Sequence, residues 1–161
     1  MDKLRNQIAA YFGENQAEML SDLKGLMEIK SKSEDRSKCE EALLYVETLA
    51  RNFGMKTTMG KYRDVCVVEA GEGEETLGIL AHVDVVEEGA LELWECEPFT
   101  LTQKDGLLFG RGIIDDKGPL IGNLYALKFL KENISTWKRR IWLIVGSSEE
   151  TEWIDMEDFK E

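Results

Sequence analysis

Hydrophobic residues recur at helical spacing in the first part of the chain. Residues 2–12 predict a short helix, and residues 16–29 predict a second helix after a polar break at residues 13–15. In the second segment, four apolar side chains fall on one stripe, namely Met19, Leu20, Leu23 and Met27. A stripe of this kind packs against a core, so we expect both segments to be scaffold.

A third helix is predicted after Ser37. Ser37 and Glu40 have the spacing of a capping box, in which the two side chains satisfy free amide groups at a helix N-terminus. Apolar residues then recur every three or four positions up to Phe53, and Gly54 is a typical helix stop. We therefore expect an amphipathic helix over this segment.

Beyond residue 55 the pattern changes to short runs that predict β-strands. Residues 56–60 and 64–70 are strand-like and are separated by a short turn. The run LGILA at 77–81 is too short for a free-standing helix and predicts a buried strand. The run RIWLIVG at 140–146 predicts a second buried strand.

Between these two buried strands the sequence predicts a hairpin and a helix. Asp105 and Gly106 are typical residues of a tight hairpin turn. The helix is expected from near Pro119 to about Glu132, and a last amphipathic piece at 153–159 begins another helix. Alternating strands and helices predict an α/β fold with a central mixed or parallel sheet flanked by helices.

Composition and charge narrow the class of protein. The 161 residues carry 32 acidic and 20 basic side chains, a net charge of −12, which argues against binding to nucleic acid or to an anionic membrane. No apolar run approaches the roughly 18 residues of a membrane span, and the N-terminus lacks the apolar core of a signal peptide. We therefore expect one cytoplasmic domain. Its three cysteines have no CxxC spacing and are expected to be free core thiols.

Three predicted loops carry side chains that can bind metal. They are His82 with Asp84, Asp115 with Asp116, and Glu149 with Glu150. If parallel strands bring these loops together, the carboxylates converge on the only histidine of the sequence. Like charges at close range destabilise a fold, so such a cluster usually needs a cation. Nitrogen and oxygen ligands without thiolate suit Zn²⁺, Mn²⁺ or Co²⁺.

Each of these features also has a structural interpretation. His82 can be a structural histidine at a strand end, the aspartate pair can cap the next helix, and the glutamate pair can be surface acids. Similarly, Lys117 can be a solvated charge. The order and spacing of all the features together favour a metal site.

Four ordered motifs resemble those of the M20 family of co-catalytic metallopeptidases. They are HVDVV at 82–86, W(x3)PF at 94–99, DGLLFGRGIIDDKGP at 105–119 and GSSEETEW at 146–153. The resemblance is to the dipeptidase branch, the PepV-like or Xaa-His dipeptidases, and its strong part covers about residues 77–153. The loop after HVDVV differs from the family pattern, because it carries Glu87 and Glu88 where a proline is common.

The resemblance implies a role for each residue of the first two loops. His82 is expected to bind one metal, with Asp84 orienting and polarising its imidazole. Asp115 is expected to bridge two metals. Its bond to Asp116 is expected to be a cis peptide.

The resemblance also implies the chemistry of the third loop. Glu149 resembles the general base that takes a proton from the attacking water and later returns it, and Glu150 resembles a ligand of the second metal. The cofactor would be two divalent ions, Zn²⁺ or alternatively Mn²⁺ or Co²⁺. The implied activity is a metal-dependent dipeptidase acting on dipeptides or short peptides.

Some features of the family are expected at positions beyond residue 161. A second-site aspartate, a second metal histidine and a lid domain lie downstream in the family, whereas this sequence ends at Glu161 and has one histidine. We therefore interpret residues 1–161 as the N-terminal part of a zinc-peptidase-like catalytic domain, incomplete at its C-terminus and inactive alone. The exposed edge of the interrupted sheet is expected to favour self-association.

Two other functions are compatible with the sequence. One is an amidohydrolase or deacylase acting on N-acyl amino acids, because substrate-selecting residues of the family lie downstream. The other is a non-catalytic interaction module that keeps the first half of the fold.

Overall fold

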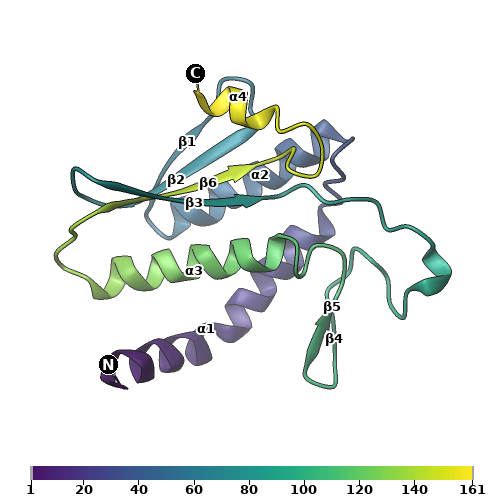
Figure 1. Ribbon diagram of the computed structural model, residues 1–161. Helices are drawn as coiled ribbons and strands as arrows, with labels where there is room; N and C mark the ends of the chain where they lie inside the picture. The colour runs from purple at the N-terminus through teal and green to yellow at the C-terminus, as the bar shows by residue number, and fades with distance from the viewer. Residues whose placement is uncertain (1, 161) are drawn as a thin grey trace.

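A four-stranded sheet runs through the centre of the protein, with helices on both sides of it (Figure 1). The computed structural model describes residues 2–160. The elements in chain order are α1 (Asp2–Glu28), α2 (Arg36–Asn52), β1 (Lys56–Met59), β2 (Val65–Gly71), β3 (Thr76–His82), η1 (Leu91–Leu93), β4 (Thr102–Lys104), β5 (Leu107–Phe109), α3 (Lys117–Asn133), β6 (Arg140–Gly146) and α4 (Asp155–Lys160). The predicted α/β class, with a mixed sheet flanked by helices, is confirmed.

The strand order places the two predicted buried strands side by side. The order is β1-β2-β6-β3, in which β1, β2 and β6 are successively antiparallel and β3 is parallel to β6. Since parallel neighbours need a crossover connection, α3 lies between these two strands in the chain. His82 at the end of β3 is level with Gly146 at the end of β6. The loops that follow both strands therefore leave from the same edge of the sheet.

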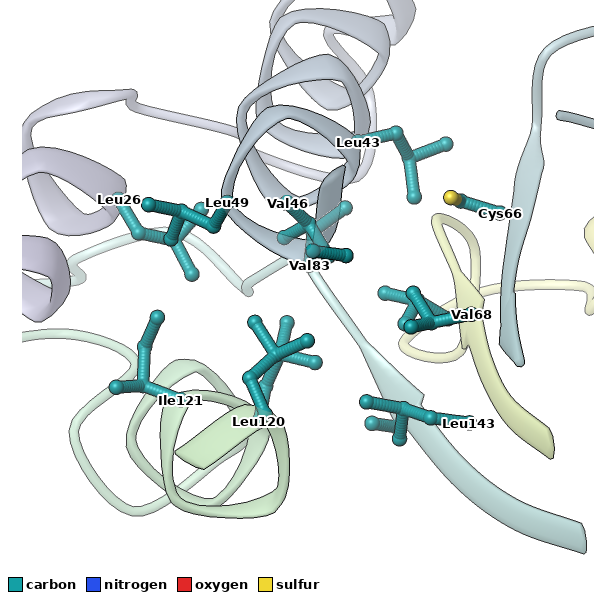
Figure 2. Close-up of a cluster of buried hydrophobic side chains, with 14 of the residues drawn as sticks. Leu26, Leu43, Val46, Leu49, Cys66, Val68, Val83, Leu120, Ile121 and Leu143 are labelled. Atoms are coloured by element: carbon teal, nitrogen blue, oxygen red, sulfur yellow. The ribbon is translucent and has the colours of Figure 1, made fainter. Parts of the chain in front are cut away.

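One face of the sheet packs on α2 and α3 to form the core. Figure 2 shows side chains from both helices and from the strands meeting in this core, among them Leu43, Val46, Val68, Leu120 and Leu143. All five side chains are fully buried. Burial of each such side chain contributes roughly 1.5–3 kcal/mol. This packing holds the sheet in place and so positions the edge from which the loops leave.

The N-terminal segment is one helix, so the predicted break at residues 13–15 is wrong. A glycine in a helix costs about 1 kcal/mol, which is too little to end a helix that packs on another one. Asn15 also supports the helix, because its side-chain amide donates to the Tyr11 carbonyl at 2.8 Å. The Tyr11 ring lies 5.1 Å from the Phe129 ring of α3. Neither α1 nor any other helix within residues 2–160 is long and apolar enough to cross a membrane.

The helix α2 begins earlier than predicted and has a different cap. Its N-cap is Asp35, whose side chain accepts from the Lys38 amide at 3.1 Å. Ser37 lies inside the first turn, and Glu40 forms an ion pair with Arg63 at 2.6 Å. The capping-box prediction is therefore wrong, because an aspartate two residues upstream is an equally good cap and starts the helix first.

The strand β3 is less buried than its composition predicted. Leu77 and Leu80 are 51% and 62% exposed, whereas Ala81 and His82 are buried. The reason is position, because within residues 2–160 β3 pairs only with β6 and forms an edge of the sheet. The central strand β6, in contrast, is buried over its last four residues, as predicted.

The predicted hairpin is present between β4 and β5, which are antiparallel. Asp105 and Gly106 form its turn and have φ angles of 53° and 77°. A two-residue turn of this kind requires positive φ at both positions, which aspartate and glycine tolerate. The predicted helix after it is confirmed as α3, with Pro119 in its first turn.

The difference between the predicted and the observed cap of α2 is testable. Asp35→Ala should lower the free energy of unfolding by about 1 kcal/mol, because it removes the acceptor for the Lys38 amide. Ser37→Ala should change it by less than about 0.5 kcal/mol. Urea unfolding of the two variants measures both values, and a larger loss in Ser37→Ala would favour the original capping box.

The cysteines generate a second prediction. All three are free, as expected, but Cys39 and Cys66 are buried while Cys96 is partly exposed. Burial raises the pKa of both the Cys39 and the Cys66 thiol to about 12, so neither forms the reactive thiolate near pH 8. A disulfide reagent such as DTNB should modify one thiol rapidly in the folded protein and all three in denaturant.

The matched variant is Cys96→Ser, which should abolish the rapid reaction. Rapid modification that persists in this variant would show that a buried thiol becomes accessible in solution.

Candidate metal centre

Three loops meet at the edge of the sheet where β3 and β6 end. The Val83 amide donates to the Gly146 carbonyl at 2.9 Å, which continues the parallel pairing by one residue. The His82 amide donates to Asp116 Oδ2 at 3.1 Å and so attaches the loop before α3. The Asp115–Asp116 peptide of that loop is cis, as the resemblance implied. The convergence expected from the sequence is thus present.

The two ring nitrogens of His82 face different groups. Nδ1 lies 3.0 Å from the Asp84 carbonyl oxygen and 3.2 Å from Asp84 Oδ1. Nε2 lies 2.9 Å from Asp115 Oδ1 and 3.8 Å from Glu149 Oε2. A ring held by oxygen atoms at one nitrogen presents the other nitrogen as a ligand. Asp84 therefore lies on the Nδ1 side of the ring, and Asp115 and Glu149 lie on its Nε2 side.

Both glutamates also lie close to the His82 ring. One potential ligand atom each from His82, Glu149 and Glu150 lies within 4.8 Å of the other two. The sequence interpretation placed Asp115 among the ligands and gave Glu149 the role of base. In the structure Asp115 adjoins this group through His82 Nε2, while Glu149 is close enough to serve as a ligand or to act on a neighbouring molecule.

The Asp84 carboxylate is fully buried and holds the site together. Its Oδ1 accepts from the Glu149 amide at 3.2 Å, and its Oδ2 accepts from the Glu150 amide at 3.1 Å and the Ser33 hydroxyl at 2.8 Å. Burial by itself would raise the pKa of Asp84. The hydrogen bonds with His82, Ser33 and the Glu150 amide outweigh burial and hold that pKa below its usual value.

Ser33 and these backbone contacts could not be identified from the sequence. Ser33 lies far from Asp84 in the chain, in the segment between α1 and α2, and no motif marks it. Local spacing gives no signal for a partner of this kind, because the contact depends on how α1 and α2 pack on the sheet.

Lys117 follows the aspartate pair and is fully buried, so its interpretation as a solvated charge is wrong. Its Nζ donates to the Leu26 carbonyl at 3.1 Å and to the Ile29 carbonyl at 2.7 Å. These carbonyls lie at the C-terminal end of α1, where the helix dipole favours a cation. Burial lowers the pKa of Lys117 to about 8. Its ammonium group therefore attaches the start of α3 to the end of α1.

The two acids that depart from the family pattern are ion-paired. Lys32 Nζ lies 2.6 Å from Glu88 Oε2 and 3.8 Å from Glu87 Oε1. The Lys32 backbone also forms a parallel bridge with Val85. These contacts connect the loop after β3 to the segment between α1 and α2.

The charges of the site fit a divalent metal ion. Burial and the negative charge of Asp115 raise the pKa of Glu150, and burial is the main cause that raises the pKa of Asp116. Burial lowers the pKa of His82, but its hydrogen bonds with Asp84 and Asp115 outweigh this and raise it to about 9. A cation bound among these groups would relieve the repulsion between the carboxylates. The donors are imidazole nitrogen and carboxylate oxygen, which suit Zn²⁺, Mn²⁺ or Co²⁺.

Several proteins with sequences similar to this chain carry the name putative dipeptidase. A protein of Staphylococcus epidermidis named "Putative dipeptidase" is 39% identical, and the match covers 87% of this chain and 31% of that protein. A "Putative dipeptidase" of Staphylococcus aureus (strain USA300) is 37% identical, with 84% and 30% covered. The chain thus spans about a third of the length of these relatives.

Solved structures share the fold. Human carnosine dipeptidase 1 superposes with a TM-score of 0.81 at 22% identity, over 96% of this chain and 36% of that one. An M20 family metallo-carboxypeptidase of Sulfolobus solfataricus gives 0.75 at 27% identity, over 88% and 33%.

The model of one peptidase family matches the part of the chain that carries the site. The match extends over residues 78–158, which is just over half of the 161 residues. It includes the ends of β3 and β6, the loop before α3, and the double-glutamate loop, which is the segment 147–154 that carries Glu149 and Glu150. The chain belongs to peptidase family M20/M25/M40.

Proposed function

We propose that this chain supplies the first half of the catalytic site of a metal-dependent dipeptidase. The observation that carries the proposal is the group of His82, Glu149 and Glu150, whose ligand atoms lie within 4.8 Å of one another beside the buried Asp84. His82, Asp115 and Glu150 would hold divalent metal. The family membership and the names of the relatives support a peptide as the substrate.

The proposed roles follow from where each group lies. Divalent ions bound at this site would supply polarisation of the substrate carbonyl and activation of water. Asp84 holds His82 Nδ1, so that Nε2 stays available as a ligand. Asp115, on the Nε2 side of the ring, is placed to share a metal with His82.

Glu149 is proposed to move the proton during hydrolysis. Its side chain is partly exposed and its Oε2 faces the ligand side of the His82 ring. Oε2 would accept a proton from the attacking water as the carbon–oxygen bond forms, and would deliver it to the leaving nitrogen as the carbon–nitrogen bond breaks.

The proposal first requires that the chain binds metal. Calorimetry should detect binding of Zn²⁺ and Mn²⁺, and His82→Ala and Glu150→Ala should each weaken it at least about 10-fold, because each removes a donor. Glu152→Ala is the matched control, since Glu152 is an exposed acid of the same loop outside the group. Unchanged binding in a His82→Ala, Glu150→Ala double variant would contradict the assignment.

The catalytic role is tested separately. The 161-residue chain alone is expected to bind metal but not to hydrolyse dipeptides, because its described residues offer few protein ligands for two ions. A fusion of this chain to the part of the Staphylococcus epidermidis relative beyond the aligned region should hydrolyse dipeptides. In that fusion, Glu149→Gln should keep metal content and lower kcat roughly 10²- to 10⁴-fold.

The same assays distinguish the alternatives. Hydrolysis of N-acyl amino acids in preference to dipeptides by the fusion would favour a deacylase. Metal-dependent turnover by the 161-residue chain, abolished by Glu149→Ala, would show that the chain is a complete catalyst. Full turnover in the Glu149→Gln fusion would remove Glu149 from the mechanism.

A further inference from the structure

Four successive backbone amides of the double-glutamate loop donate to two buried carboxylates. The Ser147 and Ser148 amides donate to Asp155 Oδ2 at 2.7 and 3.0 Å. The next two amides, those of Glu149 and Glu150, donate to Asp84 as described above. The loop that presents both glutamates is thus held at its start by Asp155 and at its end by Asp84.

The position of the Asp155 carboxylate is itself tightly defined. Asp155 is 1% exposed, and its backbone amide donates to Ser148 Oγ at 3.1 Å. Its Oδ1 accepts from the Met156 amide at 2.8 Å, so both carboxylate oxygens are engaged by backbone amides. Gly146 lies directly against Oδ2, and a Cβ at Gly146 would occupy the space of this oxygen. The end of β6, the double-glutamate loop and the first residue of α4 are therefore connected by hydrogen bonds and close packing.

We propose that Asp155 is a positioning residue of the metal centre, which sets where the Glu149 and Glu150 carboxylates lie relative to His82. The inference rests on the proposed function, since it concerns the same metal site. Asp155 does not belong to the ligand group, so it acts only through the backbone of the loop. Without it the Ser147 and Ser148 amides lose their acceptor. The start of the loop then keeps the bond from the Ser147 hydroxyl to the Asp64 carbonyl, but its backbone amides are no longer fixed by a carboxylate.

Asp158 provides a matched control on the same helix. It is also buried, at 4% exposed, and it also accepts two backbone amides, those of Tyr62 at 2.9 Å and Asp64 at 3.2 Å. These amides belong to the segment between β1 and β2 rather than to the double-glutamate loop. Removing this carboxylate should therefore cost similar stability without releasing Glu149 and Glu150.

The experiment compares Asp155→Asn, Asp155→Ala and Asp158→Asn in the 161-residue chain. Zn²⁺ affinity is measured by calorimetry, the geometry of the site by the visible absorption spectrum of bound Co²⁺, and stability by urea unfolding. We expect Asp155→Ala to weaken Zn²⁺ binding about 10-fold or more and to change the Co²⁺ spectrum. Asp155→Asn, which keeps one acceptor oxygen, should lie between Asp155→Ala and wild type. Asp158→Asn should lower stability but leave affinity and spectrum unchanged.

A gentler variant covers the case in which the Asp155 variants do not fold. Ser148→Ala removes the acceptor for the Asp155 amide and should shift the Co²⁺ spectrum in the same direction by a smaller amount. Equal effects of the Asp155 and Asp158 variants on affinity, or an unchanged spectrum in both Asp155→Asn and Ser148→Ala, would overturn the inference. Absence of Zn²⁺ binding in the wild type would instead contradict the proposed metal centre itself.

Discussion

The candidate site depends on one buried carboxylate. Asp84 follows an edge strand, yet it is fully buried because its oxygens face the His82 ring, the Ser33 hydroxyl and two backbone amides of the double-glutamate loop. A buried charge is costly unless such donors satisfy it, so these contacts stabilise one another. The same carboxylate orients the imidazole and fixes the loop that carries Glu149 and Glu150. The contacts of Asp84 therefore set both the orientation of the His82 ring and the positions of the Glu149 and Glu150 carboxylates.

Charge distribution explains why this arrangement suits a cation. The buried Lys117 ammonium is engaged by the carbonyls at the end of α1, so it serves the scaffold rather than the carboxylates of the site. Lys32 likewise pairs with Glu87 and Glu88. His82 is left as the positively charged group nearest Asp115, and its hydrogen bonds with Asp84 and then with Asp115 raise its pKa against the effect of burial. Metal binding would have to displace this proton, which couples the site to pH.

Most of the secondary structure and the candidate site residues of this protein could be predicted from short stretches of sequence. The strand runs, the Asp105–Gly106 turn and the helix that starts near Pro119 were predicted correctly, because each depends on neighbouring residues and on backbone preferences. His82, Asp115 and the glutamate pair were identifiable because short, ordered motifs carry them. Errors arose where two local signals competed or where tertiary packing outweighed a local signal. Asp35 caps α2 in place of Ser37, and packing on α3 keeps α1 continuous through Gly13.

The sequence by itself therefore determined the candidate site residues His82, Asp115, Glu149 and Glu150 and the strands and loops that deliver them. Only the tertiary structure decided how they are held. Burial of Lys117 and exposure of Leu80 depend on what lies beside α3 and β3, which no residue pattern specifies. The partners of Asp84 and Asp155 are mostly backbone amides, and every residue except proline has one. Such contacts leave no mark in the sequence, because the fold and not the residue type selects the donor.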